Sequence, residues 1–228
     1  MNNLLSIETS AESCSVALSI LGQTREEFEF APRRHAELIL PMVRSLLAEA
    51  EMTLSQLDGI AFGRGPGSFT SLRIGIGVVQ GLAWGADLPV VPISSLAAVA
   101  QAAIEQGLPP GVNRVCVAMD ARMQEVYTAE FEVDTDGFAI ASGAERVCLP
   151  ADVFPEGASK VCASGNGFEV YPELETRAGE RGNFIPDCWP RAAVINHLAT
   201  RWLQVNKPLP AEKAQPVYIR NQVAIKPA

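Results

Sequence analysis

The sequence predicts an α/β protein built as two lobes, each a mixed sheet flanked by helices, with the second lobe reduced. Apolar residues recur at the period of strands in some segments and at the period of helices in others, and the two patterns alternate along the chain. A Gly- and Pro-rich stretch, Gly107–Gly111, divides the chain near its middle. On both sides of it, a strand that ends in an acidic residue is followed by a turn and a returning strand, which suggests an internal duplication.

The first segments alternate between apolar and polar residues and predict three short strands, at Leu5–Ile7, Cys14–Ile20 and Thr24–Phe30. The period changes to that of a helix over Arg33–Ala50. Pro41 lies inside this helix and should kink it, because proline removes a helical hydrogen bond. The opening therefore predicts an antiparallel meander followed by a helix.

The next segments predict strands separated by helices. Leu57–Phe62 and Val90–Ile93 have the pattern of strands, and the loop Gly63–Thr70 opens a helix between them. Ser94 and Ser95 should cap a further helix that continues to about Glu105. Strands joined through helices pair in parallel, so this half should form a mixed sheet with the meander.

We place the lobe boundary at the Gly- and Pro-rich stretch, which gives an amino-terminal lobe of residues 1–108 and a smaller carboxy-terminal lobe of residues 109–228. The second lobe should begin with strands Arg114–Met119 and Val126–Val133. After Phe138 the pattern predicts only a short strand at 160–163, a turn at 165–167, a helix at 191–203 and a tail from residue 207.

Composition excludes several classes of protein. The net charge of −8 argues against capture of a nucleic acid by this chain alone, because such binding relies on Lys and Arg. The five cysteines are scattered without a Cys-x-x-Cys pair, so we expect reduced thiols and a cytosolic protein. No apolar run reaches the length of a membrane span, and the amino terminus lacks the pattern of a signal peptide.

Two turns resemble the phosphate-binding hairpins of nucleotide-binding folds. The first contains Glu8, Thr9 and Ser10, and the second follows Asp120. Such hairpins need glycine so that phosphates can reach backbone N–H groups, and neither turn contains one. We therefore predict a degenerate nucleotide site and no cofactor, with Gly165 and Gly167 as further residues of that site. The alternative is an active phosphotransferase of the sugar-kinase type that uses Asp120 as base or magnesium anchor.

Neither the loop Gly63–Ser68 nor His35 supports another catalytic site. The loop is Gly-rich but lacks the Gly-Lys-Ser/Thr ending of a phosphate loop, so we expect it to set the approach of its helix to the sheet. Ser68 is a better helix cap than nucleophile. A metal would require a second ligand one turn after His35, where the sequence has Ile39.

The helix after Gly67 is apolar on nearly all sides, which indicates burial on more than one side. Each interior glycine costs about 1 kcal/mol relative to alanine, so its glycines at four-residue spacing require a compensating contact. We predict a protein-binding surface formed by the first two helices of the first lobe; the alternative is that the glycines pack against the first helix. The residues predicted to bind a partner are Leu38, Met42, Leu46, Ile74, Gly77, Val78, Gly81 and Gly85.

Four segments carry a resemblance to a known family: Ile7–Ser10, Gly63–Gly75, Met119–Tyr127 and Gln215–Arg220. With them the chain resembles the TsaB (YeaZ) family of tRNA threonylcarbamoyladenosine biosynthesis subunits, within the TsaD/TsaB (glycoprotease-like) group. The resemblance runs from end to end, with one departure at Ser71, where the family more often has glycine.

The resemblance implies a two-lobed actin-like ATPase fold and a non-catalytic subunit that binds and activates TsaD through its first two helices. TsaE would join the assembled complex. The tRNA would be bound by this complex and not by the chain alone, and any nucleotide would be bound only there. The complex would modify the adenosine next to the anticodon of tRNAs that read codons beginning with A, using an adenylate made by TsaC. TsaD's metal-binding His-x-x-x-His corresponds to the region of His35, where Ile39 interrupts it. Alone, the chain could form a homodimer.

Overall fold

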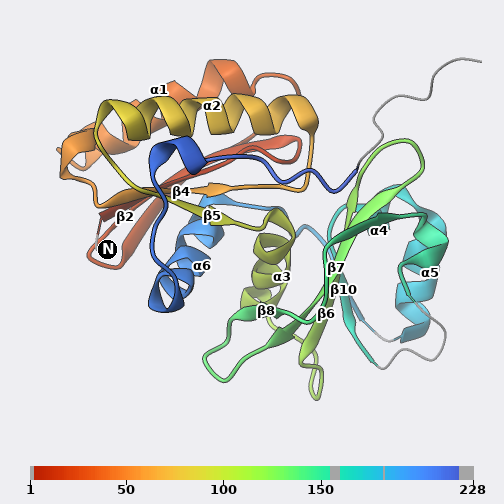
Figure 1. Cartoon of the computed structure of the whole chain (residues 1–228). Coiled ribbons are helices and arrows are strands. Elements are labelled where there is room, and N and C mark those ends of the chain that lie inside the picture. Colours follow the sequence, from red (N-terminus) through yellow and green to blue (C-terminus); the bar gives the residue numbers. More distant parts are fainter. Residues whose placement is uncertain (1–2, 155–159, 182, 221–228) are drawn as a thin grey trace, which may run out of the picture.

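We describe the protein from a computed structural model, which covers residues 3–154, 160–181 and 183–220. Its first sheet has the strand order β3-β2-β1-β4-β5 (Figure 1). The first three strands pair antiparallel, whereas β1, β4 and β5 pair in parallel. The bounds are β1 Asn3–Glu8, β2 Ser13–Ile20, β3 Gln23–Phe30, β4 Gly59–Gly63 and β5 Val90–Ile93.

The second sheet repeats this arrangement with the order β8-β7-β6-β10-β11, and β9 also pairs with β7. Again a meander of antiparallel strands is followed by parallel ones, since β6, β10 and β11 pair in parallel. The bounds are β6 Arg114–Asp120, β7 Val126–Val133, β8 Ala139–Ala141, β9 Arg146–Cys148, β10 Cys162–Ser164 and β11 Asn183–Ile185. The shared order agrees with the internal duplication suggested by the sequence.

Helices cover both faces of the first sheet, and in Figure 1 α1 and α2 lie on one face and α6 on the other. The helices are α1 His35–Glu49, α2 Phe69–Gly85, α3 Ser95–Gln106, α4 Gly167–Val170, α5 Pro172–Arg181 and α6 Ala192–Val205. Single 3₁₀ turns are η1 Leu54–Gln56, η2 Pro150–Asp152 and η3 Ala211–Lys213. As predicted, Ser94 caps α3, because its Oγ accepts a hydrogen bond from the Ala97 N–H at 3.1 Å.

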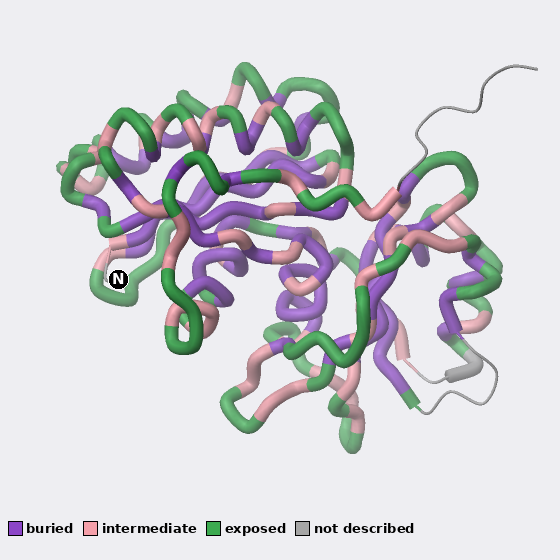
Figure 2. The backbone as a smooth tube through the Cα atoms, in the orientation of Figure 1, coloured by how far each residue is buried: buried purple, intermediate pink, exposed green. Residues whose placement is uncertain are grey.

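The core is continuous between the lobes on the side of α3. Buried apolar residues of β1 and β4 pack in one cluster with α3, α6 and the second sheet, and examples are Leu4, Val99, Val117 and Ile195. A second cluster fills the space between the first sheet and the pair α1 and α2. Figure 2 shows the resulting buried backbone through the centre of both lobes. The free cysteines Cys14, Cys116, Cys162 and Cys188 belong to the buried residues.

The sequence prediction was incomplete after Phe138. It missed β8, β9, α4, α5 and β11, and it placed a strand at 160–163 where β10 spans Cys162–Ser164. Each of these strands has three residues, which is too short to show a period of two. The lobe boundary at 108/109 stays a prediction; α6, from the second half of the chain, packs on the first sheet. Residues 221–228, the end of the predicted second lobe, lie outside the described residues.

Candidate functional site

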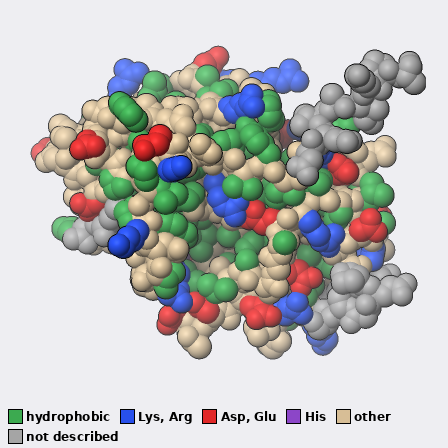
Figure 3. All heavy atoms as spheres, viewed as in Figure 1, with side chains coloured by type: hydrophobic (Ala, Val, Ile, Leu, Met, Phe, Trp, Pro, Cys, Tyr) green, Lys and Arg blue, Asp and Glu red, His purple; other side chains and the backbone are tan. Residues whose placement is uncertain are grey.

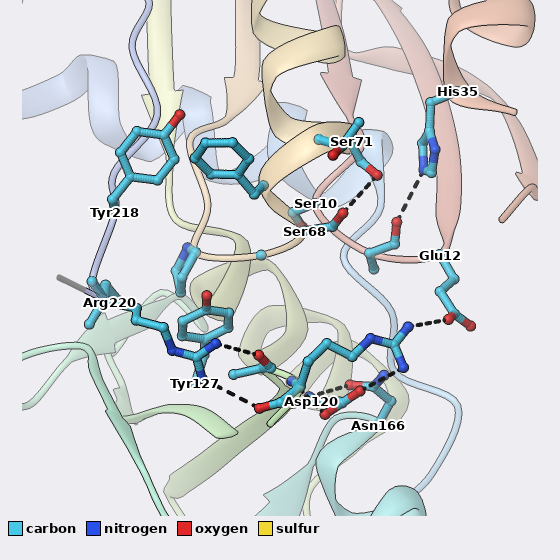
Figure 4. Close-up of a pocket in the computed structure, with 18 of the residues that line it drawn as sticks. Ser10, Glu12, His35, Ser68, Ser71, Asp120, Tyr127, Asn166, Tyr218 and Arg220 are labelled. Atoms are coloured by element: carbon cyan, nitrogen blue, oxygen red, sulfur yellow. Dashed lines mark hydrogen bonds and ion pairs between the residues drawn. The ribbon is translucent and has the colours of Figure 1, made fainter. Parts of the chain in front are cut away.

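A cavity of about 940 Å³ lies between the two lobes. It is lined by the turn after β1, the residues around the start of α1, the amino-terminal end of α2 with its preceding loop, the turn between β6 and β7, Asn166, and residues 217–220. Figure 4 shows Ser10 and Ser68 on one side of the cavity, and Asp120 and Asn166 on the other. The two turns that the sequence analysis singled out therefore face each other.

The first turn is fixed by the buried carboxyl group of Glu8. Its Oε1 accepts a hydrogen bond from the Ser10 N–H at 2.5 Å, and its Oε2 accepts one from the Ser95 hydroxyl at 2.9 Å. Burial raises the pKa of Glu8 above its usual value, although these hydrogen bonds oppose the shift. Thr9 donates to the Ser71 carbonyl at 3.0 Å. Of the three predicted residues, Ser10 lines the cavity, whereas Glu8 and Thr9 support the turn from behind.

Three glycines allow α2 and its preceding loop to approach this turn. A Cβ atom at Gly63 would overlap the Glu8 carboxylate, one at Gly67 would overlap the Ser10 carbonyl, and one at Gly75 would overlap the Thr9 hydroxyl. The Gly-rich loop thus sets the distance between helix and sheet, as expected. Ser68 occupies the N-cap position, but its Oγ lies 3.0 Å from the Ser71 Oγ and makes no capping bond.

The second turn is strained and carries bulky side chains. Arg122, Met123 and Gln124 have φ values of 61°, 57° and 60°, and each non-glycine residue in this region costs roughly 1 kcal/mol. Asp120 holds the turn, since its Oδ1 accepts from the Arg122 N–H and from the Tyr171 hydroxyl, both at 2.9 Å. Desolvation, reinforced by this bond to Asp120, raises the pKa of Tyr171 to about 12.

An ion pair crosses the space between the two turns. Arg122 donates to Glu12 across the cavity at 2.8 Å and lies 3.1 Å from the Asp120 carboxylate. These interactions raise the pKa of Arg122, and the hydrogen bond to Glu12 contributes most. A hairpin that binds phosphate needs open backbone N–H groups, and this turn presents an ion pair instead.

Gly165 and Gly167 do not line the cavity, although we predicted both as site residues. A Cβ atom at Gly165 would lie 2.5 Å from the Ala118 carbonyl oxygen, and one at Gly167 would lie 2.9 Å from the same atom. Their role is close packing on β6. Asn166, between them, lines the cavity, and its Oδ1 accepts from the Asp120 N–H at 3.0 Å.

Sequence reasoning missed the carboxy-terminal wall of the cavity. Val217, Tyr218, Ile219 and Arg220 line it, together with Phe69 of α2. The segment has no regular secondary structure, so no periodicity could locate it. The only available indication was the family-like sequence Gln215–Arg220.

The predicted partner surface is only partly exposed. Gly77, Gly81 and Gly85 are exposed, and a Cβ atom at any of them would meet no atom within 4 Å. Contact with the protein's own first helix therefore does not explain these glycines. Leu38, Ile74 and Val78 are partly buried beside them. We call these six residues the docking face, for the role that we propose below.

Two residues of the predicted partner surface have to be removed from it. Met42 is 6% exposed and Leu46 is 2% exposed, because both point from α1 into the core above the first sheet. They follow the period of the helix, but the period alone did not indicate which side of α1 faces the sheet. Both residues support the docking face from below.

His35 is a buried structural residue. Its Nε2 lies 3.1 Å from the carbonyl oxygens of Ala11 and of Ser13, so its N–H is shared between two acceptors. Ile39, one turn later, is buried in the core. In the ranges 3–154, 160–181 and 183–220, no group of three or more His, Cys, Asp or Glu residues is placed to hold a metal ion. In the same ranges, no helix has both the length and the apolar character needed to cross a membrane.

Comparison with known proteins gives one consistent result. The family model described as TsaD: tRNA N6-adenosine threonylcarbamoyltransferase matches residues 28–199. The tRNA threonylcarbamoyladenosine biosynthesis protein TsaB of Escherichia coli (strain K12) is 38% identical over 98% of this chain and 96% of its own length. The protein of the same name from Haemophilus influenzae is 40% identical over 98% of this chain and 95% of its own length. The structure of YeaZ from Pseudomonas aeruginosa superposes with a TM-score of 0.84 at 39% identity, covering 96% of this chain and all of that one.

Proposed function

Since this chain belongs to the TsaD family, and within it to the TsaB proteins, we propose that it is a non-catalytic subunit that binds and activates TsaD. In this role it takes part in forming N6-threonylcarbamoyladenosine on the adenosine next to the anticodon of tRNAs that read codons beginning with A. TsaE joins the assembled complex, and tRNA is bound through the complex. The site of action is the cytoplasm.

The proposal of a non-catalytic role is supported by the two turns at the cavity. Neither contains a glycine, and the Arg122–Glu12 ion pair spans the space between them. A kinase of the sugar-kinase type would need this space for phosphates. The chemistry of the reaction is therefore assigned to the partner.

The observation that best supports docking to TsaD is the row of glycines on the outer side of α2. Gly77, Gly81 and Gly85 cost helix stability without any contact inside the protein that requires them. Trp84, in the same part of the helix, is 73% exposed. Helix positions occupied by glycine, next to exposed apolar side chains, are typical of a surface on which another helix packs closely. The same face would serve a homodimer when TsaD is absent.

Replacing Gly81 with leucine tests this proposal. The change should raise helix propensity and leave the isolated chain folded, because a Cβ atom at Gly81 meets nothing within 4 Å. It should weaken binding to TsaD by roughly 10- to 100-fold, since overpacking costs about 1–3 kcal/mol. Affinity is measured by titration calorimetry with purified TsaD.

Gly179→Leu is the matched control, because Gly179 is also exposed in a helix, α5, and also has open space around its Cα. It should leave the affinity for TsaD unchanged. Unaltered binding by a folded Gly81→Leu variant would place the interface elsewhere, and unfolding of that variant would show that the glycine serves internal packing.

A further inference from the structure

The residues after η3 form an irregular segment, Gln215–Arg220, which we call the strap. It starts beside α2, where the Gln80 side chain donates to the Ala214 carbonyl at 2.7 Å, and it ends at the turn between β6 and β7. In Figure 1 it is the dark blue chain that runs from below α2 toward β7 of the second lobe. The strap has no helix or strand, so individual bonds determine its position.

The first lobe holds the beginning of the strap at two points. The Val217 N–H donates to the Arg64 carbonyl at 2.8 Å, and Arg64 belongs to the loop that precedes α2. The Tyr218 hydroxyl accepts a hydrogen bond from Nε of Arg73 at 2.8 Å, and its ring lies 5.4 Å from that of Phe69. Both Arg73 and Phe69 belong to α2, so the strap is attached to the amino-terminal half of that helix.

The second lobe holds the end of the strap through one side chain. The Arg220 guanidinium donates to the Ala121 carbonyl at 3.0 Å, to the Arg122 carbonyl at 3.4 Å and to the Glu125 carboxylate. The Arg220 side chain is 13% exposed, which strengthens such charged hydrogen bonds. All three acceptors belong to the strained turn that lines the cavity. Arg220 therefore joins the strap to the turn and stabilises the turn itself.

Among the described residues, two other ion pairs join the lobes beside the strap, and the Ser94 hydroxyl also donates to the Glu145 carboxylate of one of them. The Arg122–Glu12 pair is 73% and 48% exposed, and ion pairs of this kind contribute little. Arg64 makes a two-pronged pair with Glu145, at 3.0 and 3.1 Å, and supplies the carbonyl that holds Val217. On the opposite side the lobes share the core around α3. The lobes could therefore move apart at the mouth of the cavity, with the shared core around α3 acting as the hinge.

We propose that the strap holds the two lobes closed over the cavity: Arg220 attaches it to the second lobe, and Val217 and Tyr218 attach it to the first. Releasing either end lets the lobes separate at the mouth while the core around α3 stays packed. The inference concerns the isolated chain and does not depend on the role proposed with TsaD.

The separation of the lobes can be measured with two spin labels by pulsed electron resonance. Suitable positions are Ala36→Cys in α1 and Glu175→Cys in α5, both exposed, in a Cys148→Ser background. The four remaining cysteines are buried and shielded from the label. We expect Arg220→Met to shift the distance distribution to longer values and to broaden it. Amide exchange of the turn at 121–125 should rise by about tenfold or more.

Arg146→Met is the matched control, because Arg146 also donates to two backbone carbonyls, of Asp152 and Val153, but within the second lobe. It should leave the distance distribution unchanged. An unchanged distribution in folded Arg220→Met, or an equal shift in Arg146→Met, overturns the proposal. If Arg220→Met does not fold, the double variant Val217→Pro, Tyr218→Leu decides in the same assay, because it removes both bonds that hold the strap to the first lobe. An unchanged separation in the folded double variant also overturns the proposal.

Discussion

At the scale of single residues, Glu8 is an ionisable carboxyl group that is buried beside the cavity. Its side chain is 1% exposed, and the absence of a Cβ atom at Gly63 makes the space for its carboxylate. The Ser10 N–H and the Ser95 hydroxyl satisfy its oxygens, yet desolvation dominates and raises its pKa. The group holds the turn after β1 against α3.

The raised pKa of Glu8 predicts a pH-dependent effect of Glu8→Gln. A carboxyl whose pKa is raised by folding contributes stability that is fully present below its unfolded value, near 4.5, and is lost as the pH rises through the folded value. Glutamine keeps the acceptor for Ser10 and never ionises. We therefore expect Glu8→Gln to gain stability relative to the wild type as the pH rises above about 4.5. Urea unfolding at several pH values measures the difference.

Glu175→Gln controls for the loss of one negative charge, because Glu175 is exposed on α5. Its stability difference from the wild type should stay nearly constant over the same range. A constant difference for Glu8→Gln as well would mean that Glu8 ionises as easily in the folded protein as in the unfolded chain.

At the scale of elements, α2 contains two groups of glycines with opposite surroundings. Gly75 faces the sheet, where Thr9 occupies the position of a missing Cβ atom. Gly77, Gly81 and Gly85 face solvent with open space around them. The first glycine allows the helix to approach the site, and the others leave room on the docking face. From the sequence alone, each of these glycines has the same unfavourable helix propensity.

This difference predicts opposite effects for two neighbouring substitutions. Gly75→Ala should destabilise the protein by about 1–3 kcal/mol, because the added methyl group overlaps Thr9. Gly77→Ala should stabilise it by up to about 1 kcal/mol through helix propensity. Chemical denaturation of the two variants, compared with the wild type, gives both values. Equal destabilisation by both would show that Gly77 is as tightly packed as Gly75.

At the scale of the whole molecule, charge limits what the protein binds alone. The net charge is −8, and Figure 3 shows acidic and basic side chains interspersed over the visible face. Two of the arginines that line the cavity are engaged, Arg122 with Glu12 and Arg220 with Glu125. Binding to tRNA requires many unengaged cations that can replace the counterions of phosphates.

We therefore expect the isolated chain to bind tRNA no more tightly than about 1 µM at physiological salt, with affinity that falls steeply as salt is added. A gel-shift titration at several salt concentrations measures this. The same titration with TsaD present is the comparison, and there tighter binding is expected. Salt-resistant, submicromolar binding by the chain alone would refute the assignment of tRNA binding to the complex.

The sequence by itself determined the two-lobed α/β fold, its meanders and long helices, and the TsaB family, because periodicity and short motifs are local properties of the chain. It also identified Ser10 and Asp120 as residues of two turns, and the structure showed that these turns face each other. Only the tertiary structure decided which faces are buried: Met42 and Leu46 point into the core, and Gly165 packs on β6. It alone brought the strap to the cavity, since Arg220 and Ala121 lie 99 residues apart and no local pattern encodes their contact. Such contacts depend on how packed layers place distant segments, which a single sequence does not display.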